Sequence, residues 1–169
     1  MLIAIISDTH DNLATLAKFL GYIAKNPVRT IIHCGDVAEG QTLDYLAKNF
    51  SHKIYLCEGN MDYGYQLEIS AKKYPKQVNY FKEFGSANIG GLAIGFCHHK
   101  EIALSQCQGG KKYDFVFYGH THKPWHENFN NRCLANPGNL AGMFYKASFA
   151  ILDVENKKLD LKILDRMEA

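Results

Sequence analysis

Short apolar runs alternate with amphipathic segments through the first 60 residues, and this alternation constrains the fold more than any other feature of the chain. The runs at 2–7, 28–34 and 53–59 have the length and composition of strands. The first is continuously apolar and rich in isoleucine, which is typical of a strand covered on both faces. Helices are predicted between the runs, over 12–26 and 41–50. Strands that alternate with helices favour βαβ units and a parallel sheet.

The first predicted helix has a clear apolar face. Its apolar residues recur at three- and four-residue spacing, as expected for one buried side of an amphipathic helix: Leu13, Leu16, Phe19, Leu20 and Ile23. Asn12 stands immediately before this pattern and is a suitable N-cap.

The second half of the chain is richer in strands. One helical segment is predicted around 99–108, and Gly90-Gly91 suits a tight hairpin turn. The predicted strands are 84–89, 92–97, 113–119, 125–129, 132–135, 148–154 and 158–164, with Asn130-Asn131 between the fourth and fifth of them. No linker, repeat or low-complexity segment interrupts residues 1–169, so we expect one α/β domain with two sheets.

Composition narrows the classes of function. The 19 basic and 17 acidic residues give a formal charge of +2, which is far from the concentrated positive field of a duplex-binding domain, so no stable nucleic-acid complex is expected. The five cysteines contain no CxxC pair and form neither a disulfide framework nor a zinc knuckle. No stretch approaches the roughly 18 apolar residues of a membrane span, and the first apolar run follows no basic segment. These features predict a cytoplasmic protein that does not associate with a membrane.

Acids, amides and histidines collect at the downstream ends of the predicted strands. In open α/β sheets, ligand sites form at this edge. Oxygen and imidazole ligands suit manganese, iron, nickel or zinc. Five strand ends would bring seven such side chains to one rim: Asp8, His10, Asp36, Asn60, His98, His120 and His122.

Local spacing supports the same site. In an extended chain, side chains two residues apart point the same way, so Asp8 pairs with His10 and His120 pairs with His122. Taken singly, each residue also has a structural explanation, because an aspartate after a strand is often a helix cap and an asparagine after a glycine is often a turn residue. Five strand ends of this kind are hard to explain as caps and turns.

The ordered motifs resemble those of the calcineurin-like metallophosphoesterase superfamily, and in particular its small bacterial and archaeal phosphodiesterases. The blocks are DTH (8–10), GD (35–36), GN (59–60), His98 and GHTH (119–122), and NPGN (136–139) is similar to the family's NPGS. The resemblance implies two mixed β-sheets packed as a sandwich and flanked by helices, an α/β/β/α arrangement.

The resemblance also implies two divalent metal ions, most often Mn²⁺, with Fe, Ni or Zn as alternatives. One ion would be held by Asp8, His10, Asp36 and His122. The other would be held by Asp36, Asn60, His98 and His120, so that Asp36 bridges the pair. A hydroxide shared by the ions would attack phosphorus, and the cations would neutralise charge on the phosphoryl oxygens.

Some positions depart from the family pattern. Many relatives have a histidine after GN, where this chain has Met61, which cannot transfer a proton. We expect His99 to contact the substrate and act as a second catalytic residue beside Asp36. Asp62 either supports a neighbouring ligand or is an exposed turn acid, and His33 could orient a carboxylate.

The sequence therefore predicts a phosphoesterase, and favours a phosphodiesterase, that acts on a small phosphorylated or nucleotide-like substrate. The alternative is a non-catalytic scaffold of the same fold that binds protein partners. The oligomeric state is left open by the sequence, with a homodimer as one alternative because relatives of this size often pair. The physiological substrate and the preference for diester or monoester depend on loops that the motifs do not define. Tyr63 and Tyr65, in the segment 61–77, could line the cleft or lie on a packed helix surface.

Overall fold

The computed structural model describes residues 1–109, 112–129 and 132–166. The first half contains β1 (Leu2–Ile6), α1 (Leu13–Ala24), β2 (Val28–His33), α2 (Gly40–Asn49), β3 (Lys53–Cys57), α3 (Gly64–Lys73) and β4 (Val78–Phe81). The second half contains β5 (Phe84–Ile89), β6 (Leu92–Cys97), α4 (Lys100–Gln108), β7 (Phe115–Phe117), β8 (Trp125–Phe129), β9 (Arg132–Asn136), β10 (Ser148–Asp153), β11 (Lys158–Ile163) and a final 3₁₀ turn (Leu164–Arg166).

The strands form two mixed sheets. The first has the order β11-β10-β1-β2-β3-β4, in which β1 to β4 are parallel and β10 and β11 are antiparallel to their neighbours. The second has the order β5-β6-β7-β9-β8, with β6, β7 and β9 parallel. The βαβ units and the parallel sheet predicted for the first half are confirmed.

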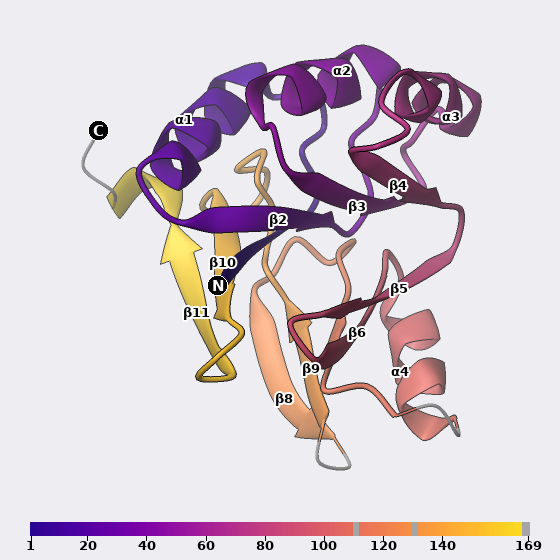
Figure 1. Ribbon diagram of the computed structural model, residues 1–169, viewed down its shortest axis with the longest axis vertical. Helices are drawn as coiled ribbons and strands as arrows, with labels where there is room; N and C mark the ends of the chain where they lie inside the picture. The colour runs from indigo at the N-terminus through magenta and orange to yellow at the C-terminus, as the bar shows by residue number, and fades with distance from the viewer. Residues whose placement is uncertain (110–111, 130–131, 167–169) are drawn as a thin grey trace.

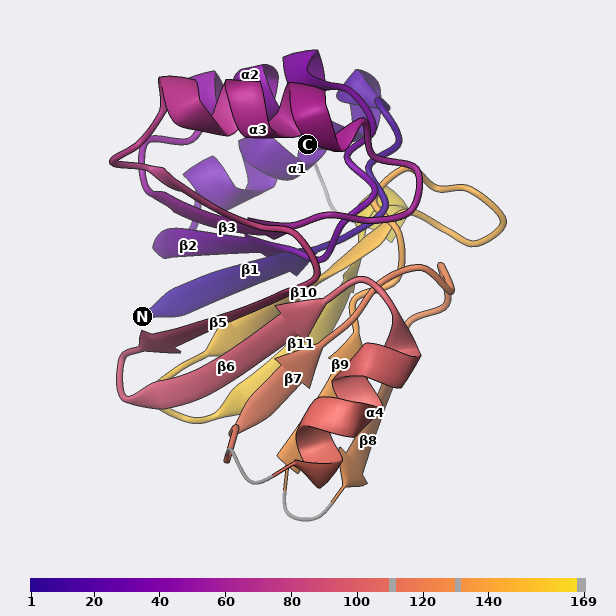
Figure 2. The ribbon, with the colours of Figure 1, turned by 90° about the vertical axis from the view of Figure 1, so that its right-hand side faces the viewer.

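Four layers are visible when the molecule is viewed from the side, with α1, α2 and α3 over the first sheet and α4 over the outer face of the second (Figures 1 and 2). Successive residues of a strand pack on opposite faces of its sheet. In β1, Ala4 and Ile6 pack under the helices, whereas Ile3 and Ile5 face the second sheet. Because both faces of β1 are covered, its sequence is continuously apolar, and the predicted α/β/β/α arrangement is confirmed.

The second sheet follows the same rule. Phe115 and Phe117 of β7 face the first sheet, and Val116 packs towards α4. The hairpin between β5 and β6 turns at Gly90 and Gly91, whose φ angles of 58° and 86° suit a two-residue turn that requires left-handed backbone at both positions. Asn130 and Asn131 lie outside the described residues.

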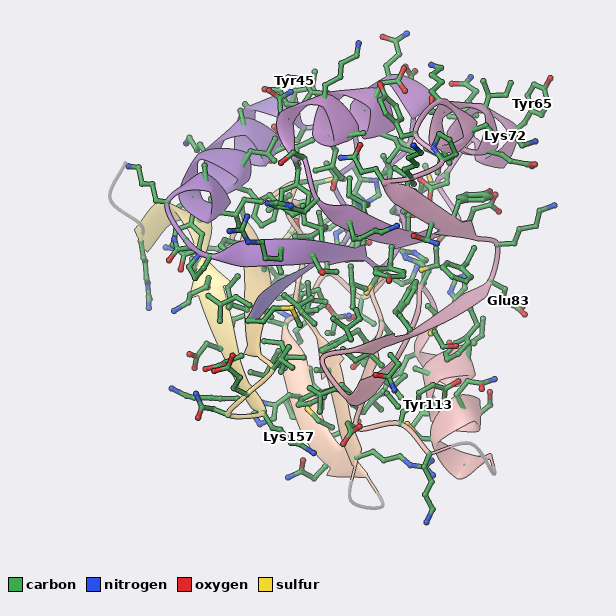
Figure 3. The ribbon with its side chains drawn as sticks, in the orientation of Figure 1. Tyr45, Tyr65, Lys72, Glu83, Tyr113 and Lys157 are labelled. Atoms are coloured by element: carbon green, nitrogen blue, oxygen red, sulfur yellow. The ribbon has the colours of Figure 1, made fainter. Side chains whose placement is uncertain are left out.

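Among the described residues, β4, α3 and the final 3₁₀ turn were given no bounds from the sequence pattern. The strand β4 is only four residues long and pairs with β3 at the edge of the first sheet, so it carries little periodic signal. The helix α3 follows the third strand end, and Figure 3 shows Tyr65 and Lys72 projecting from it into solvent. Tyr65 is 79% exposed, so it lies on a helix surface as one interpretation had it, but it is not packed there.

Candidate metal centre

The polar strand ends of both sheets meet in one place. The loop after β1 is hydrogen-bonded to the loop after β2, with Asp8 N donating to Gly35 O (2.9 Å) and His10 N donating to Asp36 O (3.0 Å). The loop after β7 joins them, because Gly119 N donates to His98 O at 3.0 Å and His120 N donates to Asp8 Oδ2 at 3.2 Å. Residues 112 positions apart in the chain are thus held side by side.

Four of the seven predicted ligands form a compact cluster. One donor atom from each of Asp8, His10, Asp36 and His122 lies within 4.8 Å of every other. His122 Nε2 is 3.2 Å from Asp8 Oδ1, and His10 Nε2 is 3.7 Å from Asp36 Oδ2. These four residues are the set that the family resemblance assigns to one ion.

A second group of side chains shares Asp36. His98 Nε2 lies 3.3 Å from Asp36 Oδ2 and 3.0 Å from Asn60 Oδ1. The His120 ring packs beside the His98 ring with 5.1 Å between their centroids. The carboxylate of Asp36 therefore stands between the two groups, while Asn60 and His120 form the exposed rim.

Left-handed backbone is concentrated at these residues. Asp8, His10, Asp36, His120 and His122 all have φ angles between 43° and 65°, a region that non-glycine residues seldom occupy. Such conformations cost free energy, and they persist where surrounding contacts over-determine them, most often at functional sites. The extended backbone assumed for the pairs 8/10 and 120/122 is therefore wrong, although Asp8 and His10 do reach the same cluster. Their side chains are aimed by tight turns, and the pair 120/122 is divided between the two groups.

Two glycines allow the ligand loops to approach one another. A Cβ on Gly59 would clash with the side chain and backbone nitrogen of Asp36, and a Cβ on Gly119 would lie 2.9 Å from Asp8 Oδ2. Real Cβ atoms do not approach this closely, so glycine is required at both positions.

Asp62 ties two of the loops together. Its Oδ2 atom accepts hydrogen bonds from Asp36 N (3.0 Å) and Gly59 N (2.7 Å), and its Oδ1 atom accepts one from Ala38 N (2.7 Å). Burial raises the pKa of Asp62 to about 6, although these backbone donors oppose the rise. The structure thus favours the supporting role for Asp62 over an exposed turn acid.

The NPGN turn fixes the loop that carries the last two histidines. Asn136 Nδ2 donates to Gly119 O (2.7 Å) and Thr121 Oγ1 (3.1 Å), and the fully buried Asn139 donates from Nδ2 to His122 O (3.2 Å). The sequence NPGN contributes to the family resemblance but predicts no structural role for Asn136 or Asn139. The two asparagine amides that flank Pro-Gly were the signal of a side chain that bonds nearby backbone.

Charges inside the site influence one another. Burial raises the pKa of Asp36, but the hydrogen bond and charge of His98 and the Met61 N–H outweigh it, so that the pKa is lowered overall. Burial likewise lowers the pKa of His98, and Asp36 more than compensates, which raises it. Close contact with Asp8 raises the pKa of His122 against a smaller effect of burial.

The remaining two histidines near the site differ in their contacts. His99 is half-buried next to His120, with 4.8 Å between ring centroids, and burial and the neighbouring imidazoles lower its pKa. His33 shares a 2.8 Å hydrogen bond with Thr9 Oγ1, so it orients a hydroxyl and not a carboxylate.

The residues present fit a cation. Asp8 is fully buried, and its Oδ1 atom makes no hydrogen bond although His122 Nε2 lies 3.2 Å away. A buried carboxylate oxygen without a hydrogen-bond partner is costly unless a charge compensates it. Carboxylate, amide and imidazole donors are the set that suits manganese, iron, nickel or zinc.

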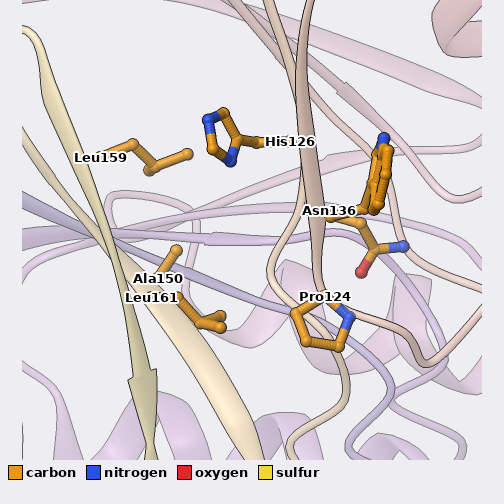
Figure 4. A pocket seen from close by; sticks show the side chains of 7 residues that line it. Pro124, His126, Asn136, Ala150, Leu159 and Leu161 are labelled. Atoms are coloured by element: carbon orange, nitrogen blue, oxygen red, sulfur yellow. The ribbon is translucent and has the colours of Figure 1, made fainter.

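A separate small pocket of about 110 Å³ lies where β8 and β9 approach β10 and β11 (Figure 4). It is lined by Pro124, Trp125, His126, Asn136, Ala150, Leu159 and Leu161. Its lining is largely apolar and does not overlap the carboxylate–imidazole cluster.

Two packed mixed sheets with helices outside, and carboxylates and imidazoles gathered at their shared edge, define the class of calcineurin-like phosphoesterases. The model of the calcineurin-like phosphoesterase superfamily domain matches residues 1–157, and the chain belongs to this superfamily.

Relatives and solved structures agree with this assignment. The chain is 31% identical to a phosphodiesterase from Methanocaldococcus jannaschii over 94% of its length and 96% of the relative's. It is 34% identical to a probable metallophosphoesterase from the same organism, over 82% of this chain and 67% of the other. The structure of an archaeal phosphodiesterase matches with a TM-score of 0.88 at 29% identity, covering 96% and 99% of the two chains.

A vacuolar protein sorting 29 structure from Cryptosporidium parvum shares the fold, with a TM-score of 0.70, 20% identity, and 96% and 95% of the two chains covered. Among the described residues, no helix has the length and hydropathy needed to cross a membrane.

Proposed function

We propose that the protein is a dinuclear metal-dependent phosphodiesterase acting on small phosphorylated or nucleotide-like substrates. The observation that carries the proposal is the position of Asp36, whose Oδ2 atom lies 3.7 Å from His10 Nε2 in one group and 3.3 Å from His98 Nε2 in the other. One carboxylate can in this way serve two ions.

Asp8, His10, Asp36 and His122 would hold one ion, and Asp36, Asn60, His98 and His120 the other, with Mn²⁺ preferred and Fe, Ni or Zn as alternatives. Bound ions of this kind generate a nucleophile from water near neutral pH and stabilise charge on a phosphoryl group. Hydrogen bonds with Asp62 and with the NPGN turn hold the ligand loops in fixed positions relative to one another.

His99 would contact the substrate from beside the exposed rim formed by Asn60 and His120. Because its pKa is lowered, its imidazole is neutral near pH 7 and can donate one N–H hydrogen bond to a phosphoryl oxygen. Met61 offers no proton, so a good leaving group favours the reaction. A cytoplasmic location remains a prediction from the sequence, and a homodimer remains one open alternative for the oligomeric state.

Hydrolysis of bis(4-nitrophenyl) phosphate with added Mn²⁺ tests the proposal. Asp36→Ala should lower the rate by at least about 100-fold, because it removes a shared ligand. His52→Ala is the matched control, since His52 contacts Arg29 on the surface and should leave the rate unchanged. Equal inactivity of wild type and Asp36→Ala with Mn²⁺, Ni²⁺, Zn²⁺ and Fe²⁺ would refute the enzymatic proposal.

Metal content provides a second test of the enzymatic proposal. About two ions per chain after loading with Mn²⁺ and desalting is the result expected for the enzyme. A chain that retains no metal after the same treatment would instead support a protein-binding scaffold.

A further inference from the structure

An exposed aromatic loop stands beside the candidate metal centre. Phe144 is 87% exposed, and its neighbours Met143 and Tyr145 are 42% and 47% exposed. The loop connects β9 to β10, and Figure 2 shows it, in orange, projecting beyond the carboxyl ends of the strands. Three adjacent exposed apolar side chains contribute little to folding, because their surface stays in water.

The base of this loop is bonded to the ligand loops. Ala141 N donates to Asp8 O (3.0 Å), and the Asn12 side chain donates to Ala141 O (2.9 Å). Met143 N donates to Asn139 Oδ1 (2.7 Å), and Asn139 Nδ2 in turn bonds His122 O. The aromatic loop is therefore held in a fixed relation to Asp8 and His122.

Phe144 is held in an unfavourable conformation next to a candidate ligand. Its φ angle is 62°, where a side chain with a Cβ is strained, and its ring centroid lies 5.6 Å from that of His122 with the planes tilted by 45°. Strain of this kind accumulates where function requires a particular geometry. A ring that is both strained and exposed is explained by a ligand more readily than by packing.

We propose that Phe144 forms one wall of a substrate subsite that accepts a flat aromatic group, either an aryl ring or a nucleobase, esterified to the phosphate. The inference rests on the proposed function, which places the phosphoryl group at the ligand cluster beside His122. A substituent on that phosphate extends outward past His122, where the exposed face of Phe144 is available for stacking. Base–aromatic stacking is worth about tenfold or more in affinity, so Phe144 determines specificity and not the chemical step.

A second exposed apolar side chain lies next to the other group of ligands. Met61 is 57% exposed, and its backbone N–H donates to Asp36 Oδ1 at 2.8 Å. A thioether adapts to rings of different shape. Phe144 on the His122 side and Met61 on the Asn60 side thus give the centre an apolar border, which suits a substrate with an organic group better than free phosphate.

Binding to the Mn²⁺-loaded protein, measured by titration calorimetry, tests the subsite with two matched ligand pairs. Phenyl phosphate is compared with methyl phosphate, and adenosine 5′-monophosphate with ribose 5-phosphate. Wild type should prefer the aromatic member of one pair by about tenfold, which corresponds to about 1.4 kcal/mol. Phe144→Ala should remove that preference without changing the Kd of the non-aromatic member, and Phe144→Tyr should keep it. The ligand pair in which wild type shows this preference identifies the group that the subsite accepts, an aryl ring or a nucleobase.

Other outcomes overturn the inference. If Phe144→Ala leaves both preferences unchanged, or weakens all four ligands equally, the ring is not a stacking wall. Metal content and Tm are measured on each variant, so that a disturbed His122 is recognised. Wild-type protein that binds no metal and does not hydrolyse bis(4-nitrophenyl) phosphate would refute the proposed function itself. If the wild type is active but Phe144→Ala leaves the preference for aromatic ligands unchanged, only the subsite is refuted.

Discussion

Several single residues in this molecule adopt strained backbone or are fully buried, and their contacts hold the cluster of carboxylates and imidazoles in place. His33 illustrates this at the end of β2, where its ring is 1% exposed, one nitrogen bonds Thr9, and Nδ1 has no hydrogen-bond partner. Burial lowers its pKa to about 3, although Asp8 and Asp36 oppose the shift. The neutral ring holds Thr9, which lies between two candidate ligands, at the cost of stability in acid.

His33 should make the protein less stable as the pH falls. The unfolded chain binds a proton at this histidine near pH 6.5, whereas the folded protein does so only near pH 3, so stability is lost on acidification through that window. Within this window, the free energy of unfolding should fall by about 1.4 kcal/mol for each pH unit of acidification. In His33→Gln the dependence of the free energy of unfolding on pH should be shallower by about that amount, as measured by urea unfolding with EDTA at pH 6.5 and 4.5.

His52→Gln is the control for this experiment, because His52 lies on the surface beside Arg29. It should leave the slope of wild type nearly unchanged. If His33→Gln and wild type lose stability in parallel between these pH values, His33 is not buried as a neutral ring.

At the scale of loops and strands, the geometry of the candidate metal centre depends more on the loops that follow the strands than on the strands themselves. The strands other than the four-residue β4, and the first helix, could be predicted from the sequence, since apolar runs and three- to four-residue spacing report burial directly. The direction of His120 and His122 could not, because it depends on left-handed backbone at both residues and on hydrogen bonds from Asn136 and Asn139. The same limit applies to Phe144, whose position follows from the base of its loop.

The GHTH loop should divide its two histidines between two ions. His122 Nε2 lies 3.2 Å from Asp8 Oδ1, whereas the His120 ring lies against that of His98. Each of His122→Ala and His120→Ala should therefore lower bound Mn²⁺ from about two ions to about one per chain and abolish the exchange-coupled EPR signal of a manganese pair.

Double variants show which ion each histidine serves. His120→Ala combined with Asn60→Ala should still retain about one ion, because both changes affect the same group. His120→Ala combined with His10→Ala should retain almost none. Equal losses in the two double variants would contradict the division.

At the scale of the whole molecule, the candidate centre joins the two sheets. Asp8, Asp36 and Asn60 follow strands of the first sheet, and His98 and the GHTH histidines follow strands of the second. The fold class follows from the order of strands and helices, but the seven side chains come together only through pairing between segments far apart in the chain. The family motifs supplied that long-range information, and local periodicity could not. A cation bound by both sheets would bind the folded chain and not the unfolded one.

Manganese should therefore raise the Tm, and the rise should depend on pH. At a free Mn²⁺ concentration about 100 times the Kd, binding to the folded state stabilises it by about 2.7 kcal/mol per site. Imidazole ligands must be deprotonated to bind a metal. The pKa values of His98 and His122 are raised above 6.5 in the metal-free protein, so protons should begin to compete above that pH, and the Tm gain should shrink as the pH falls from about 8 to 6. Differential scanning fluorimetry with Mn²⁺ or EDTA across this range measures the gain, and Asp36→Ala, which lacks the shared ligand, should show little gain at any pH. A gain in wild type that is the same at pH 8 and pH 6, or that persists in Asp36→Ala, would mean that manganese stabilises the protein somewhere other than between its two sheets.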